Sequence, residues 1–114
     1  MRRACETARA IAKACPCSPE VIPELHEVGG LYHAQLVSGE HVKVPGTGLT
    51  REQFAKDFPG FDTSRLPAVG QWDNRRGFEP TMQSITRAAD VAAWLCSESL
   101  QAEIGEGTLV LVNF

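Results

Sequence analysis

A long amphipathic helix followed by a short apolar strand is the feature that most constrains the fold of this 114-residue chain. Residues 82–99 carry apolar side chains at helical spacing, with Thr81 as the predicted N-cap. After a break at Gly105 to Gly107, residues 108–112 form an uninterrupted apolar run, typical of a parallel strand buried on both faces. A helix followed by such a strand predicts an α/β domain. The predicted apolar face of the helix comprises Ile85, Ala88, Ala89, Ala92, Leu95 and Cys96.

The charge distribution narrows the classes of partner. The net charge is −3 and the sequence pI is about 5.6. The longest basic runs are the pairs Arg2-Arg3 and Arg75-Arg76, too little for a nucleic-acid or anionic-membrane footprint. No apolar stretch approaches the roughly 20 residues that cross a bilayer, and the Arg- and Ala-rich start lacks the apolar region of a secretory signal. We therefore expect a soluble, cytoplasmic protein that binds neither nucleic acid nor membranes.

The cysteines and histidines do not follow a metal-binding pattern. Cys15-Pro16-Cys17 is a single C-x-C pair with no second pair at zinc spacing. The histidines, His26, His33 and His41, are scattered through loop-like sequence. Without a secretory signal we also expect no disulfide. The cysteines are interpreted as small buried thiols, and no metal or organic cofactor is predicted.

The first eighty residues are predicted to contain two helices and a long loop-rich region. Residues 2–14 form an amphipathic helix that ends at the Pro16 turn, and residues 20–22 are a short β-like run. Residues 31–80 are rich in Gly and Pro and are predicted to be mostly loop, apart from a helix within 48–59. That helix begins with a capping box formed by Thr50 and Gln53.

The region 31–80 is interpreted as an insertion, because a loop of this length is unusual in a compact domain unless it covers a site. Trp72, Arg75 and Arg76 combine aromatic and basic character, as a substrate lid would. A packed surface loop explains the same composition equally well. The sequence leaves both readings open.

The first nine residues, MRRACETAR, resemble a segment of the histidine phosphatase (phosphoglycerate-mutase-like) family, commonly S-P-(M/L)-x-R-A-x-x-T-A. In that family the arginine before the alanine binds the transferred phosphoryl group from the first turn of its helix. The resemblance implies this role for Arg3. A guanidinium grips phosphate oxygens in a fork, and a helix N-terminus adds backbone donors. The alternative for Arg3 is an ordinary solvated arginine.

A second motif contains Glu27, which lies eighteen positions after Arg9. The run VIPELHEVGG at 21–30 is similar to the family's strand, then L-x-E, then glycine pattern, which places the family's general acid and base at Glu27. A carboxyl group suits that role when burial or a neighbouring negative charge raises its pKa. The alternative is a solvent-exposed acid ahead of the Gly29-Gly30 turn.

The order of the remaining elements also resembles that family, so the resemblance covers residues 1–114 as a partial histidine-phosphatase-like domain. It implies an α/β fold, a three-layer α/β/α sandwich whose central sheet is incomplete. The family's R-H-G strand, which holds the nucleophilic histidine, has no counterpart in residues 1–114. Its later S-H-G motif falls where this chain has Val112, Asn113 and Phe114. The expectation is an internal fragment that is inactive by itself.

The resemblance implies a phosphomonoester hydrolase, a phosphatase or a mutase, that works through a phosphohistidine on a phosphorylated small molecule. The specific substrate is not implied. A non-catalytic α/β module that binds an anion or a partner is an alternative, and a reading frame without a function of its own is a third. The apolar strand at 108–112 would leave an exposed sheet edge, so self-association is also expected.

Overall fold

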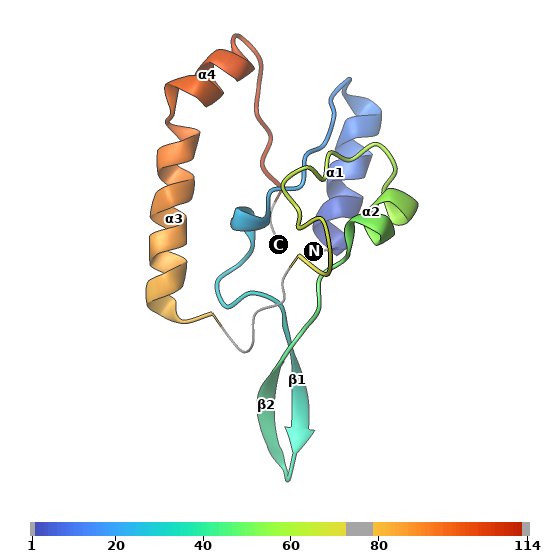
Figure 1. The fold of residues 1–114 in the computed structure, drawn as a ribbon, viewed down its shortest axis with the longest axis vertical. Helices are drawn as coiled ribbons and strands as arrows, with labels where there is room; N and C mark the ends of the chain where they lie inside the picture. The colour runs from blue at the N-terminus through green and yellow to red at the C-terminus, as the bar shows by residue number, and fades with distance from the viewer. Residues whose placement is uncertain (1, 73–78, 113–114) are drawn as a thin grey trace.

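The computed structural model describes residues 2–72 and 79–112. The elements are α1 (Arg2–Ala14), the 3₁₀ turn η1 (Pro23–Leu25), β1 (Tyr32–Val37), β2 (Glu40–Pro45), α2 (Arg51–Asp57), α3 (Thr81–Leu95) and α4 (Glu98–Ile104). These helices and strands fall into three parts that are separate in Figure 1. The parts are a body that contains α1 and α2, a hairpin of β1 and β2 that projects from it, and an arm that consists of α3 and α4. The described residues therefore form a mixed fold of helices and one small antiparallel sheet.

The hydrophobic core lies in the body, between α1, α2 and the chain that follows α2. Phe54 and Phe58 are almost completely buried and their rings are 5.8 Å apart. Cys5 and Leu66 complete this core cluster. Arg51 holds the loop after α2 in place, since its side chain donates hydrogen bonds to the carbonyl oxygens of Leu66 (2.8 Å) and Ser64 (2.6 Å). Packing of the Phe54 and Phe58 rings thus stabilises the body, and Arg51 holds the loop after α2 against it.

Local signals at the start of α2 are confirmed. The Thr50 hydroxyl accepts a hydrogen bond from the backbone N–H of Gln53, and the Gln53 side chain accepts one from the backbone N–H of Thr50 at 2.8 Å. Both halves of the predicted capping box are therefore present. The predicted helix over residues 2–14 is also confirmed, and it coincides with α1.

The predicted helix over 82–99 is divided in two. It begins at Thr81, whose predecessor Pro80 is the N-cap and offers no side-chain hydrogen bond, so the predicted Thr81 cap is wrong. The helix ends at Leu95, and Ser97 starts α4 by accepting a hydrogen bond from the backbone N–H of Leu100. Sequence spacing missed this break because the apolar period continues across it, while a serine cap competes locally for the backbone.

The predicted apolar face of that helix is also wrong in its direction. Ile85 is 55% exposed, and Ala88, Ala89 and Ala92 are exposed as well. The side turned inward carries buried Ser84 and half-buried Arg87, Val91 and Trp94, which recur at helical spacing. The orientation of the helix is set by the polar contacts of Arg87, described below, and not by burial of its apolar face.

The hairpin β1–β2 replaces part of the predicted loop at 31–80, so that prediction is wrong for residues 32–45. The strands pair antiparallel from Tyr32 opposite Pro45 to Val37 opposite Glu40. They are joined by Ser38 and Gly39, which have φ angles of 52° and 86°, the positive values that a two-residue hairpin turn of the I′ kind requires. All twelve strand residues except Val44 are exposed.

Residues 108–112 do not form the predicted buried strand. They run from the end of α4 back toward the body in Figure 1, and within the described chain they belong to no sheet. Leu109, Val110 and Leu111 are 41%, 58% and 44% exposed. The radius of gyration is 15.9 Å, against about 13 Å for a compact domain of this length. The separated parts account for that expanded shape.

Candidate functional site

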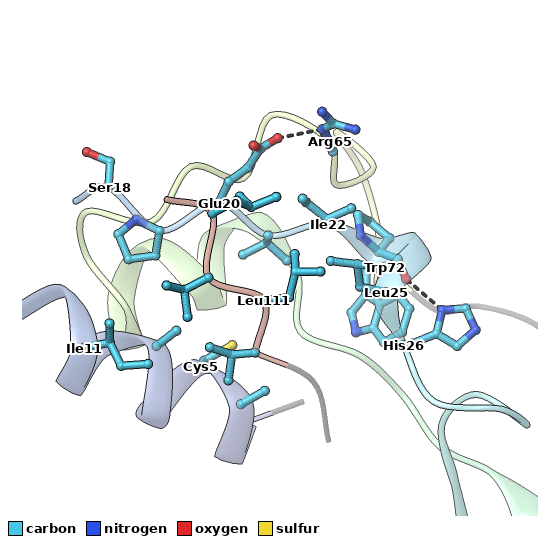
Figure 2. A pocket seen from close by; sticks show the side chains of 18 of the residues that line it. Cys5, Ile11, Ser18, Glu20, Ile22, Leu25, His26, Arg65, Trp72 and Leu111 are labelled. Carbon is cyan, nitrogen blue, oxygen red and sulfur yellow. Dashed lines mark hydrogen bonds and ion pairs between the residues drawn. The ribbon is translucent and has the colours of Figure 1, made fainter. Parts of the chain in front are cut away.

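A cavity of about 720 Å³ lies between α1, the chain that follows it and residues 108–112 (Figure 2). Its walls are mostly apolar, and Ile11, Ile22 and Leu111 are among the side chains that Figure 2 places around it. Polar groups reach it from the first turn of α1 and from the turn after η1. Apolar walls with a few converging polar groups are the usual form of a small-molecule site.

Arg3 and Glu27, the two residues singled out by the sequence, both line this cavity. Arg3 belongs to the first turn of α1, and Glu27 follows η1 by two residues. Both side chains belong to exposed residues, so each can be reached from solvent. The fold therefore brings the predicted phosphate ligand and the predicted acid to one cavity from two separate elements.

The other arginines of α1 are occupied elsewhere. Arg2 pairs with Asp57 at 2.5 Å and lies over the Phe58 ring at 5.6 Å. Arg9 lies over the same ring at 5.4 Å. Within the described part of the chain, the Arg3 side chain makes neither a hydrogen bond nor an ion pair. Arg2 and Arg9 thus attach α1 to α2, whereas the Arg3 guanidinium, in the first turn of α1, does not take part in that contact.

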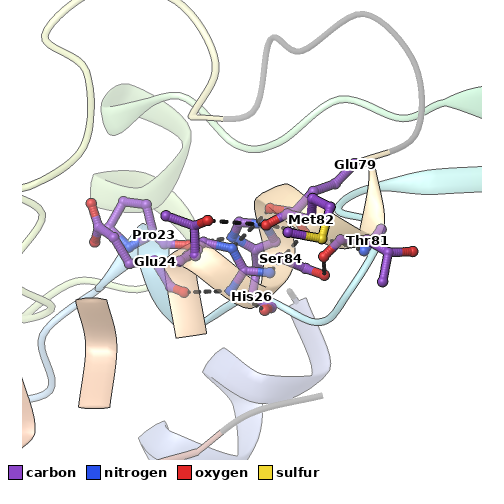
Figure 3. A network of polar contacts seen from close by, with 10 residues as sticks. Pro23, Glu24, His26, Glu79, Thr81, Met82 and Ser84 are labelled. Carbon is purple, nitrogen blue, oxygen red and sulfur yellow. Dashed lines mark hydrogen bonds and ion pairs between the residues drawn. The ribbon is translucent and has the colours of Figure 1, made fainter. Parts of the chain in front are cut away.

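A buried ion pair fixes the turn that carries Glu27 (Figure 3). The Glu79 side chain is only 3% exposed and accepts hydrogen bonds from Arg87 through Nε (2.9 Å) and Nη2 (2.7 Å). The backbone N–H of Gly29 donates to the same carboxylate at 3.3 Å, and the backbone N–H of Glu79 donates to the Gly29 carbonyl at 3.1 Å. Glu27 therefore lies two residues from an anchored glycine.

Arg87 also donates hydrogen bonds to the residues that precede Glu27 in this turn. Its Nη1 donates to the carbonyl oxygens of Glu24 (2.7 Å) and His26 (2.9 Å). The hydrogen bonds from Arg87 are the main reason that the pKa of Glu79 falls from 4.5 to about 2. Glu79 is consequently a carboxylate at neutral pH, and the pair holds residues 24–29 against the start of α3.

His26 lines the cavity but is poorly placed as a nucleophile. Its Nδ1 lies 2.7 Å from the Pro23 carbonyl oxygen, and its Nε2 lies 3.6 Å from a carboxylate oxygen of Glu79. Both ring nitrogens thus face acceptor oxygens, and neither directs a lone pair into the cavity. Cys5 also lines the cavity, and burial raises the pKa of its thiol, which disfavours the reactive thiolate.

Trp72 forms part of the cavity wall. Its indole packs so closely on Gly48 that a Cβ at position 48 would fall 2.0 Å from the ring, and its ring centroid is 5.5 Å from that of His26. The indole Nε1 is buried without a hydrogen-bond partner in the described chain. Trp72 is therefore held between Gly48 and His26. Its role as part of a lid stays a prediction. Arg75 and Arg76, the other predicted lid residues, lie outside the described residues, as do Asn113 and Phe114.

Sequence reasoning missed the pair of Glu79 and Arg87. Glu79 precedes α3 and Arg87 lies within it, so their separation of eight residues matches no helical i,i+4 spacing. The other contacts of Arg87 reach residues more than sixty positions away. A single sequence contains no local signal for such a contact.

Among residues 2–72 and 79–112 no helix is long and apolar enough to cross a membrane, and no group of three or more His, Cys, Asp or Glu side chains is arranged to hold a metal ion. We compared the chain with protein families, with curated proteins and with solved structures, and none of the three comparisons found a match.

Proposed function

We propose that this chain supplies the phosphate-binding and proton-donating part of a phosphomonoester hydrolase site of the histidine phosphatase type. In this proposal Arg3 binds the phosphoryl oxygens and Glu27 acts as general acid and base. The observation that carries it is the position of both residues on one cavity, with Arg3 unpartnered within the described chain while Arg2 and Arg9 are engaged. The three-layer sandwich with an incomplete sheet belongs to the same proposal.

The proposed reaction has two balanced steps. A histidine from outside residues 1–114 attacks phosphorus, forming an N–P bond as the ester P–O bond breaks, and Glu27 protonates the departing oxygen. Water then attacks phosphorus, the N–P bond breaks, and the Glu27 carboxylate accepts a proton from that water. The Arg3 guanidinium and the backbone N–H groups at the start of α1 stabilise charge on the transferred oxygens in both steps.

Phosphate binding is the direct test. Titrating the 114-residue chain with inorganic phosphate, followed by NMR shifts of backbone amides, should perturb the first turn of α1 and residues 26–30. Arg3→Ala should weaken binding by about tenfold or more, since hydrogen bonds to charged groups contribute roughly 1.5–3 kcal/mol. Lys13→Ala removes the same charge from the far end of α1 and should change little. Equal losses of phosphate affinity in the two variants would mean that only the net charge of the chain matters, and would overturn the proposed Arg3 site.

A test of Glu27 as the general acid requires an active enzyme. The polypeptide must therefore be extended by any coding sequence that flanks residues 1–114. In that protein Glu27→Gln should slow alkyl phosphates much more than aryl phosphates, because an aryl leaving group needs little protonation. Unchanged hydrolysis of alkyl phosphates would remove Glu27 from the mechanism. The 114-residue chain alone should not turn over an aryl phosphate, and turnover that His26→Gln abolishes would make His26 the nucleophile instead.

The position of His26 favours a second candidate function. Both of its ring nitrogens face oxygens, so His26 is not available as a nucleophile, and in this second candidate function the cavity would bind an anion without turnover. A non-catalytic anion-binding module would give the same Arg3-dependent phosphate titration. It would differ in showing no phosphatase activity in the extended polypeptide, with or without the Glu27→Gln substitution.

A further inference from the structure

The chain exposes much more surface than a compact protein of its size. Its accessible surface is 8021 Å², whereas a compact monomer of 12.4 kDa exposes about 6,100 Å². The excess of about 1,900 Å² per chain exceeds the roughly 800 Å² that each partner buries in a standard protein interface. Area is therefore available for a stable dimer.

Residues 108–112 hold a distinctive part of this surface. Leu109, Val110 and Leu111 are each more than 40% exposed, and the segment carries no charged residue. No hydrogen bond to its backbone occurs within the described chain. Unpaired backbone groups on an extended, uncharged, β-branched-rich segment pair readily with another strand.

The hairpin β1–β2 is the competing exposed surface, and it differs in two respects. Half of its backbone groups, those on the facing edges, are already paired between the two strands. Its exposed apolar side chains lie among the charged Glu40 and Lys43, and charges of this kind oppose edge-to-edge pairing. The segment 108–112 has neither protection, so it is the stronger candidate for an interface.

We infer that two copies of this chain dimerise through residues 108–112, which pair antiparallel about a two-fold axis at Val110. The segment Thr-Leu-Val-Leu-Val suits this symmetry, because Leu109 then lies opposite the partner's Leu111 and Val110 lies opposite its own copy. The pairing supplies hydrogen bonds to the backbone groups along one edge of each segment. Neither Arg3 nor Glu27 takes part in this pairing, although residues 108–112 line the same cavity as both.

Charge placed on the axis gives the sharpest test. In Val110→Lys or Val110→Glu, like charges face each other directly across the axis, which destabilises a cross-strand pair. Sedimentation equilibrium should find the unmodified chain dimeric and each variant monomeric. An equimolar mixture of the two variants should recover the dimer, because Lys then faces Glu. Recovery on mixing also shows that neither variant has simply failed to fold.

Val42→Lys is the matched control, since Val42 is an exposed valine of the hairpin, 44% accessible. It should remain dimeric. A monomeric unmodified chain would overturn the inference, as would open-ended oligomers in place of a dimer. Loss of the dimer in Val42→Lys but not in Val110→Lys would assign the interface to the hairpin. Failure of the mixed variants to associate would exclude the two-fold pairing at Val110.

Discussion

The body and the α3–α4 arm of this molecule are held together by different forces. In the body, Phe54 and Phe58 are buried to 0% and 1% exposure, and α1 and α2 close around them. In the arm, the inward-facing Arg87 donates four side-chain hydrogen bonds, two of them to the buried carboxylate of Glu79. Apolar packing depends little on pH, whereas a buried ion pair fails when either partner is lost. The two halves should therefore respond to different perturbations.

The largest expected effect is on the body. Phe54→Ala should lower the free energy of unfolding by on the order of 3–5 kcal/mol, because it removes a fully buried ring and leaves a cavity. Urea unfolding followed by circular dichroism measures this loss. Phe54→Leu should cost less and keeps the comparison measurable if the alanine variant does not fold. The control Ile85→Ala, at a 55% exposed position, should change stability by less than about 0.5 kcal/mol.

Breaking the ion pair should have the next largest effect. Arg87→Met leaves the Glu79 carboxylate buried without its partner, and removing one member of a buried pair costs about 3 kcal/mol or more. Replacing both residues, in Glu79→Leu with Arg87→Met, should recover much of that loss, because no charge then remains buried. If the double variant is no more stable than Arg87→Met by urea unfolding, the pair does not act as a unit.

Acid should weaken the arm through the same pair. The pKa of Glu79 is lowered from 4.5 to about 2, so this carboxylate stabilises the fold above pH 4.5 and its contribution is lost as the pH falls toward 2. Urea midpoints measured across this interval should decline. Glu79→Gln should be less stable at neutral pH but should decline less steeply in acid. Glu106→Gln, which changes an exposed carboxyl, should follow the unmodified chain.

The smallest effects concern the helix caps, in both the body and the arm. Thr50→Ala and Ser97→Ala should each cost about 1 kcal/mol, because both side chains accept a hydrogen bond from a helix N-terminus. Thr81→Ala should cost only a few tenths of a kcal/mol, since Pro80 occupies the cap position of α3. A loss near 1 kcal/mol for Thr81→Ala in thermal unfolding would restore the sequence-based cap.

Local signals predicted the body better than the arm. The helix α1 and the Thr50 capping box depend on residues a few positions apart, and both are present. The hairpin had a usable signal that was overlooked, because Ser38-Gly39 is a turn dipeptide. The facing of α3 could not be predicted, because contacts of Arg87 with residues distant in sequence outweigh the alanine stripe.

The candidate site divides in the same way. Arg3 and Glu27 were identified through resemblance to short family motifs, and the fold places both on one cavity. The supporting pair of Glu79 and Arg87 was missed, because its members share no local pattern with each other or with the Glu27 turn. The short motifs thus identified two residues of the cavity wall but not the ion pair that supports one of them.

The two tryptophans have different surroundings, so tryptophan fluorescence can report on two places in the fold. Trp72 is wedged between Gly48 and His26 at the cavity, whereas Trp94 on α3 lies beneath the Arg65 guanidinium at 5.1 Å, where the arm meets the body. With Trp94→Phe, fluorescence would report on Trp72 beside Gly48 and His26, and with Trp72→Phe it would report on Trp94 beneath Arg65; both indoles line the cavity. Coincident emission changes in the two variants during unfolding would mean that body and arm behave as one cooperative unit.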